Sequence, residues 1–250
     1  RIGESGAPAM AKSSMVLRCL LSLTCLLFLR VLAADEVPAA IVTAIVTTVR
    51  QPPAAMWRDW LCYHLFLGFD HVLVFHDDAD DADTIELTDA FPRDRVKSWT
   101  RGDTLSELWR RGLVWEKVGP FARSEVMARQ MLNVEVATMH LRRMYLADGG
   151  NASQTTPPES VAAPALWLLH IDADELFFSK RFSGSAVWRH FAALTAQEFR
   201  QAVYLNVEAV AEGILPGNVS AFVNMTLFKR NIITFNSPEL RRAHLEWGRD

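Results

Sequence analysis

Continuous apolar runs alternate along the chain with segments in which apolar residues recur at helical spacing. The clearest runs are rich in Val, Ile and Leu, which is typical of strands buried on both faces of a parallel sheet. Strands are predicted over residues 40–49, 71–76, 96–100, 165–171, 202–210 and 227–235. Helices are predicted over residues 56–67, 83–90, 121–146 and 185–194.

The predicted elements follow one another in the order β-α-β-α-β-α-β. This alternation is typical of α/β proteins in which a mainly parallel sheet carries helices on both faces. We therefore expect one Rossmann-like α/β domain over residues 35–250. Because the chain stops at Trp247-Gly-Arg-Asp250 with no closing element, we expect that the C-terminal part of this domain is missing.

Residues 1–34 have the pattern of a leader followed by a secretory targeting segment. Lys12 and Arg18 precede an apolar run over residues 19–29, and small residues precede Asp35. The run is shorter than the roughly 20 residues that span a bilayer. The segment is either a cleaved signal peptide or an uncleaved signal-anchor, and only the anchor would attach the protein to a membrane.

Glycosylation sequons agree with this targeting segment. Asn151, Asn218 and Asn224 each begin an Asn-x-Ser/Thr sequence. Together these features predict a protein of the secretory pathway, located in the Golgi lumen, held in the Golgi membrane or secreted.

Composition and charge argue against several functions. Half of the 250 residues are apolar, which suffices for a sizeable core, and the formal net charge is -3. Because no basic tract is present, we expect no nucleic-acid partner. The sequence also lacks the G-x-G-x-x-G, P-loop and G-x-S-x-G motifs, which counts against dehydrogenases, kinases and α/β-hydrolases.

Three acids, Asp172, Asp174 and Glu175, come directly after the apolar run over residues 165–171. Acids are poor strand formers, and ligands of open α/β sheets bind at the carboxyl ends of the strands. Carboxylate oxygens suit Mg²⁺ or Mn²⁺. We predict that Asp174 and Asp172 bind such a cation and that Asp172 also contacts a nucleotide. The alternative is a solvated loop after a strand.

A second acidic cluster, residues 77–81, follows the strand predicted over residues 71–76. An acid in this position of a nucleotide-binding fold can bind the base or the ribose hydroxyls. We therefore predict that Asp77 and Asp78 bind the nucleotide. The alternative is a turn in which Asp81 or Asp83 caps the next helix.

The long predicted helix carries polar residues that precede the acidic strand. Arg123, Arg129, Gln130 and Asn133 lie on its polar side, which either borders the nucleotide or is a solvated helix face. Ser124 is a candidate N-cap of this helix.

Two segments resemble a known group of enzymes. Residues 60–78, WLCYHLFLGFDHVLVFHDD, resemble the W-x-x-Y-H-x-x-L-G-F-D-H-V block of family 2-like and family 92-like glycosyltransferases. Residues 167–177, WLLHIDADELF, resemble the D-x-D-E block of the same enzymes. The resemblance extends over roughly residues 40–235, and these two blocks carry its specificity.

The resemblance implies a GT-A type fold, a nucleotide-sugar donor and a divalent cation. Asp172 and Asp174 match the D-x-D pair, and Asp77 and Asp78 match the two residues after the second strand, where this chain has Asp in place of the family's Asn at position 78. Inverting members use a carboxylate base. That base has no matching residue here.

Candidates for the catalytic base, and for a metal or phosphate ligand near the C-terminus, are suggested only by their position in the sequence. Glu208, Glu212 and Glu239 follow the D-x-D segment and are candidate bases. His244 is a candidate metal or phosphate ligand.

The expected function is a glycosyltransferase that moves a sugar from a nucleotide-sugar donor to a hydroxyl of a glycan or glycoconjugate, assisted by Mn²⁺ or Mg²⁺. Two alternatives stay open at this point. One is a metal-dependent phosphoesterase or pyrophosphatase, and the other is a non-catalytic relative that binds nucleotide or glycan.

Overall fold

A four-stranded, entirely parallel sheet is the largest sheet in the described chain. The computed structural model describes residues 40–146, 163–178, 186–204, 207–210, 213, 219–225 and 227–229. The strands of this sheet are β1 (Ile41–Val49), β2 (His71–His76), β3 (Val96–Thr100) and β4 (Ala165–His170). Their order is β3-β2-β1-β4. The predicted α/β class and parallel sheet are therefore confirmed.

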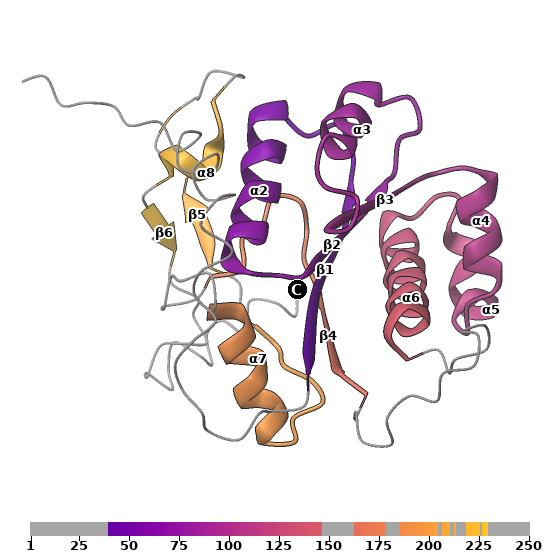
Figure 1. Ribbon diagram of the computed structural model, residues 1–250. Helices are drawn as coiled ribbons and strands as arrows, with labels where there is room; N and C mark the ends of the chain where they lie inside the picture. Colours follow the sequence, from indigo (N-terminus) through magenta and orange to yellow (C-terminus); the bar gives the residue numbers. More distant parts are fainter. Residues whose placement is uncertain are drawn as a thin grey trace, which may run out of the picture. The chain divides into compact units, whose positions relative to one another are not determined.

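Helices cover both faces of this sheet, as predicted (Figure 1). The helices of the described chain are α2 (Ala54–Leu67), α3 (Ala82–Asp89), α4 (Asp103–Arg110), α5 (Trp115–Val118), the 3-10 helix η1 (Gly119–Phe121), α6 (Val126–Tyr145), α7 (Ala186–Ala196) and α8 (Ala221–Asn224). Successive side chains of β1 point to opposite faces and enter two different cores. Ile45 packs with residues of α2 and α7, whereas Val46 packs with residues of α4 and α6.

Local sequence signals explain several element ends. Gly68 ends α2 with a φ of 97°, a conformation that glycine adopts without steric cost. Asp81 caps α3 by accepting a hydrogen bond from the backbone N–H of Thr84 at 3.3 Å. Of the two capping residues suggested by the sequence, the structure uses Asp81.

The segment between β3 and β4 differs from its prediction. The long helix starts at Val126 instead of residue 121, and Glu125, without a side-chain capping bond, precedes it. Ser124 is therefore not the N-cap. The short helices α4, α5 and η1 were not predicted, although Leu105 and Trp109, four residues apart, mark the buried side of α4.

The acidic strand is less buried than its sequence suggests. In β4 only Leu169 is buried, although the apolar run predicted burial on both faces. The reason is its position, since β4 pairs with β1 and is an edge strand within the described sheet.

The two late strands are shorter than predicted and belong to a separate sheet. β5 (Glu208–Val210) and β6 (Leu227–Lys229) pair with each other in antiparallel fashion. The prediction of strands over residues 202–210 and 227–235 therefore holds only for these short parts, and residues beyond 229 lie outside the described chain.

The strand order creates a switch point between β1 and β4. From β1 the chain builds β2 and β3 on one side, and then crosses to place β4 on the other side of β1. In open α/β sheets ligands bind outside the carboxyl ends of the strands at such a point. The sheet order thus selects the ends of β1 and β4 as the place to look for a site.

Several predicted features of targeting lie outside the described residues. These are the segment 1–34 and the sequon residues Asn151 and Asn218. Asn224 ends α8, and its side chain is not described. Among the helices of the described residues, none is long and apolar enough to cross a membrane.

Candidate functional site

Polar residues gather where the strands of the parallel sheet end. Asp77 follows β2, Arg101 follows β3 and Asp172 comes shortly after β4. Because the strands are parallel, all these positions lie at the carboxyl ends of the strands, on one side of the sheet that we call the strand-end edge. This edge joins the two acidic clusters that the sequence singled out.

Asp77 is held by a buried arginine. Arg129 of α6 donates from Nε to Oδ1 at 2.5 Å and from Nη2 to Oδ2 at 2.7 Å, and each side chain is only 4% exposed. Nη1 of Arg129 also donates to the backbone carbonyl of Ala122 at 3.1 Å. Arg101 approaches Asp77 more distantly, at 3.9 Å, and is 38% exposed. Both carboxylate oxygens of Asp77 therefore accept hydrogen bonds from Arg129 of α6. The role of Asp77 in binding a nucleotide stays a prediction.

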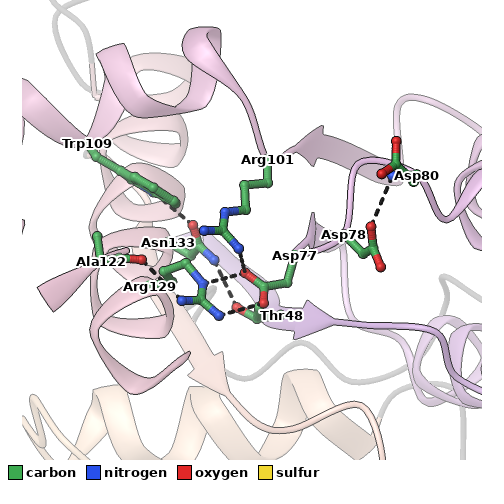
Figure 2. A network of polar contacts seen from close by, with 9 residues as sticks. All are labelled: Thr48, Asp77, Asp78, Asp80, Arg101, Trp109, Ala122, Arg129 and Asn133. Atoms are coloured by element: carbon green, nitrogen blue, oxygen red, sulfur yellow. Dashed lines mark hydrogen bonds and ion pairs between the residues drawn. The ribbon is translucent and has the colours of Figure 1, made fainter. Parts of the chain in front are cut away.

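Asn133, one helical turn after Arg129, continues this network (Figure 2). Its Oδ1 accepts a hydrogen bond from Nε1 of Trp109 at 2.9 Å, and its Nδ2 donates to Oγ1 of Thr48 at 2.9 Å. Together, Arg129 and Asn133 connect α6 to the ends of β1 and β2 and to α4. We call these two residues with Asp77, Thr48 and Trp109 the α6 network.

The remaining acids of the second cluster organise the loop after β1. Asp78 points away from the α6 network in Figure 2 and accepts a hydrogen bond from the backbone N–H of Asp80 at 3.0 Å. Its other oxygen accepts from Nε2 of Gln51 at 2.8 Å, and Asp81 accepts from the backbone N–H of Gln51 at 2.9 Å. Gln51 has a φ of 46°, which is uncommon for a residue with a side chain. These contacts favour the turn for Asp80 and Asp81.

The turn after β4 exposes two carboxylates. Asp172 and Asp174 are exposed, whereas Ala173 and Glu175 between and after them are partly buried. The turn is closed by a backbone hydrogen bond from Glu175 N–H to the carbonyl of Asp172 at 3.1 Å. We call residues Asp172–Glu175 the acidic turn. Nε2 of Gln130, the neighbour of Arg129 on α6, donates to Oδ1 of Asp172 at 2.7 Å.

The acidic turn offers two exposed carboxylates, which is fewer than the ligands of a preformed metal site. Among the described residues, no three His, Cys, Asp or Glu side chains are grouped so that they could hold a metal ion. Mg²⁺ and chemically similar cations are often held by one or two carboxylates, with water and phosphate oxygens as further ligands. Asp172 and Asp174 supply hard oxygen donors of this kind on one exposed turn.

The chain after the acidic turn is attached to α2. Nε1 of Trp60 donates to the carbonyl of Glu175 at 2.6 Å, and the hydroxyl of Tyr63 donates to the carbonyl of Phe177 at 2.9 Å. The backbone N–H of Phe177 donates to Nε2 of His64 at 3.2 Å. The two sequence blocks that carry the resemblance therefore contact each other directly, although more than 110 residues separate them.

His64 can make its contacts in only one protonation state. Its Nδ1 lies 2.9 Å from the carbonyl of Trp60 and must donate, while its Nε2 accepts from Phe177 and must carry a lone pair. Burial lowers the pKa of His64 to about 3, and the hydrogen bond to Trp60 opposes this shift only in part. His64 is therefore neutral in the folded protein near neutral pH.

Two hollows on the described surface lie away from the acidic turn. One of about 180 Å³ opens beside Gln51 and Asp81, and another of about 530 Å³ lies along the first half of β4 and the end of α7. The first is smaller than the roughly 300–1,000 Å³ of typical ligand pockets. The second borders the wrong end of β4 for the acids. We therefore locate the candidate site by the polar residues at the strand ends and not by the size of these two hollows.

The other candidate residues do not join the site in the described chain. Glu208 is exposed on β5, in the small antiparallel sheet. Glu212, Glu239 and His244 lie outside the described residues. The candidate base and the late ligand therefore stay predictions.

Sequence reasoning missed the buried roles of Arg129 and Asn133. It placed both on a polar or solvated helix side, whereas both are buried. A signal was present, since Leu132, Val136 and Ala137 share their face of the helix at spacings of three and four residues. A polar residue within an apolar stripe indicates that it has a buried hydrogen-bonding partner. For Arg129, the acids at 77–81 were candidates for that partner.

Comparisons with known proteins do not identify a relative of this chain. No family model, no curated protein and no solved structure matches it.

We predict that Arg129→Met lowers the free energy of unfolding by about 3–5 kcal/mol, because it leaves the Asp77 carboxylate buried without its partner. Chemical denaturation measures the loss. The matched control is Arg110→Ala, which breaks an ion pair with Glu107 whose side chains are more than half exposed, and should cost under about 1 kcal/mol. Equal, small losses in both variants would contradict the buried pair.

We predict that His64 makes the protein less stable as the pH falls below about 6.5. The unfolded chain takes up a proton near that pH, whereas folded His64, with its pKa near 3, does not, so stability drops by about 1.4 kcal/mol per pH unit. His76, whose pKa burial lowers to about 4, acts in the same direction and serves as a common background. Denaturation between about pH 6 and pH 4 should show a shallower slope in His64→Gln. Identical slopes would disprove the assignment.

Proposed function

We propose that this protein is a metal-assisted glycosyltransferase with a GT-A type domain, which uses a nucleotide-sugar donor. The observation that carries the proposal is the acidic turn. It presents Asp172 and Asp174 to solvent directly after β4, beside the switch point of the sheet. The contact between the two blocks of the resemblance, through Trp60, Tyr63 and His64, is a second and independent support.

In this proposal each part of the strand-end edge has its own task. Asp172 and Asp174 hold Mn²⁺ or Mg²⁺, which when bound supplies positive charge to the departing diphosphate. Gln130 orients Asp172 through its hydrogen bond. Asp78 lies at the end of β2, where an acid can accept hydrogen bonds from a nucleotide. Asp77 supports this edge through Arg129.

The acceptor is a hydroxyl of a glycan or glycoconjugate. A carboxylate of the chain takes the proton of this hydroxyl as its oxygen attacks the anomeric carbon. The described residues do not select this base. A metal-dependent phosphoesterase and a non-catalytic binding protein make different predictions, because the first releases phosphate without an acceptor and the second binds nucleotide without turnover.

We predict that Asp174→Ala abolishes the stabilisation of the protein by nucleoside diphosphates in the presence of Mn²⁺. A thermal-shift screen of nucleoside diphosphates with and without Mn²⁺ measures this. Asp80→Ala is the matched control, since it removes an equally exposed carboxylate from the turn after β2. The fold should persist in both variants, because both side chains are exposed. If Asp174→Ala keeps the Mn²⁺-dependent shift, the metal assignment is wrong.

We predict that the protein made in a secretory host either loses residues 1–34 or keeps them as an anchor, and that it carries glycan on Asn151. Mass spectrometry of the purified protein and of Asn151→Gln distinguishes these forms. A cytosolic protein with an intact N-terminus and no glycan would argue against the secretory pathway.

A further inference from the structure

The acidic turn is held at both of its ends but by different elements. At its start, the backbone N–H of Ile171 donates to the carbonyl of Val46 of β1 at 3.3 Å. At its end, Glu175 and Phe177 are bonded to α2. The place of Asp172 and Asp174 therefore depends on α2 as well as on the sheet.

The side chains of α2 that make these bonds lie on one face of the helix. Trp60, Tyr63 and His64 are spaced by three and four residues, which brings them together on the helix surface. The rings of Trp60 and His64 are 4.2 Å apart, and those of Tyr63 and His64 meet edge to face at 5.2 Å. Trp60 and His64 are fully buried. This group, which we call the α2 clamp, has little freedom to move.

The segment that the α2 clamp holds is itself anchored in the core. Phe177 is 6% exposed and packs edge to face on Phe69 at 5.6 Å. Its backbone N–H and carbonyl are both bonded to the clamp, by His64 and Tyr63. Burial raises the pKa of Tyr63 to about 12, so its hydroxyl keeps the proton that it donates. A buried, hydrogen-bonded anchor, Phe177, therefore lies three residues after Asp174, the second of the two exposed carboxylates.

We propose that Trp60, Tyr63 and His64 are positioning residues that set the place of Asp172 and Asp174 for a divalent cation. This inference rests on the proposed function, because it assumes that the acidic turn binds metal. Metal sites need their ligands within about 0.5 Å of the productive geometry, and groups outside the ligand shell supply that accuracy. The clamp acts through the main chain, so it touches neither cation nor substrate.

A purely structural role for the clamp predicts a different result. Removing one of its bonds would then lower the stability of the protein and leave the metal affinity of the folded molecules unchanged. A positioning role predicts that metal affinity falls even in variants that stay folded. Removing a hydrogen bond made directly to a metal ligand typically lowers metal affinity by about 10–100-fold. The clamp bonds the chain beyond the ligands, so we expect the lower end of this range, about tenfold.

Tyr63→Phe is the sharpest variant, because it deletes one hydroxyl and keeps the ring in place. Tyr145→Phe is its matched control. The hydroxyl of Tyr145 makes a hydrogen bond with Nε2 of His71 at 2.5 Å, at the start of β2 and thus at the opposite edge of the sheet. Both variants lose one hydrogen bond of a tyrosine to a distant segment, and only Tyr63 is attached to the chain after the acidic turn.

His64 allows a test by rescue. His64→Gln keeps an acceptor for the backbone N–H of Phe177, whereas His64→Leu removes it. The positioning role predicts that metal affinity is lost in His64→Leu and largely restored in His64→Gln. Should His64→Leu fail to fold, Tyr63→Phe still tests the proposal.

The experiment is a titration of the full chain with Mn²⁺, followed by electron paramagnetic resonance, alone and with uridine, guanosine or cytidine diphosphate. Hydrogen exchange of residues 171–178 in the same variants reports the order of the turn. We expect Tyr63→Phe to raise the Kd for Mn²⁺ about tenfold and to speed exchange in this segment, with Tyr145→Phe unchanged in both.

Three other outcomes would contradict the positioning role, and one of them would also contradict the proposed function. If wild type and Tyr63→Phe bind Mn²⁺ equally while Asp174→Ala does not bind, the positioning role is wrong and the proposed function stands. If Tyr145→Phe weakens binding as much as Tyr63→Phe, the effect is general and the positioning role is again wrong. If wild type binds no Mn²⁺ under any of these conditions, the proposed function fails and the positioning role fails with it.

Discussion

The ion pair between Asp77 and Arg129 ties the strand ends of the sheet to helix α6. Burying two charges is expensive, and such a pair is often no more stabilising than apolar residues of the same size. Its contribution here is geometric, because a bidentate contact restricts the orientation of the guanidinium relative to the carboxylate and so restrains the helix that carries Arg129. With Arg129 directed to β2, the next residue, Gln130, reaches Asp172 after β4. One helix thus relates the two acidic clusters to each other.

Patterns within a short stretch of sequence were enough to predict most elements of the fold. The apolar runs predicted β1, β2 and β3 to within a residue, and the helix predicted over residues 56–67 ends at the same residue as α2. The same local reasoning failed where pairing between distant segments decides the outcome. Asp77 and Arg129 are 52 residues apart, and the spacing of apolar residues along the sequence does not predict that their side chains form a contact. Likewise, the composition of β4 suggested a central strand, whereas only its neighbours determine that it is an edge strand in the described sheet.

The candidate site shows the same division between local and distant information. Acids after an apolar run are visible in the sequence, which is enough to predict Asp172 and Asp174 as ligands, and the structure places both on an exposed turn. The residues that hold this turn were not recognised, because Trp60, Tyr63 and His64 occupy positions that any buried helix face would fill with similar side chains. What distinguishes them is the bonding of their polar atoms to the main chain of a segment more than 110 residues away.

The charges of the strand-end edge are unevenly compensated. Asp77 is neutralised by Arg129, and Arg101 at the end of β3 keeps a half-exposed guanidinium. Asp172 and Asp174 form no ion pair with residues of the described chain. A diphosphate could approach them only with a cation in between, since like charges repel. The ends of β3 and β4 are three strand spacings apart, which is roughly 14 Å. A nucleotide-sugar of the kind proposed above would have to extend across the ends of β2 and β1 in order to contact both Arg101 and the acidic turn.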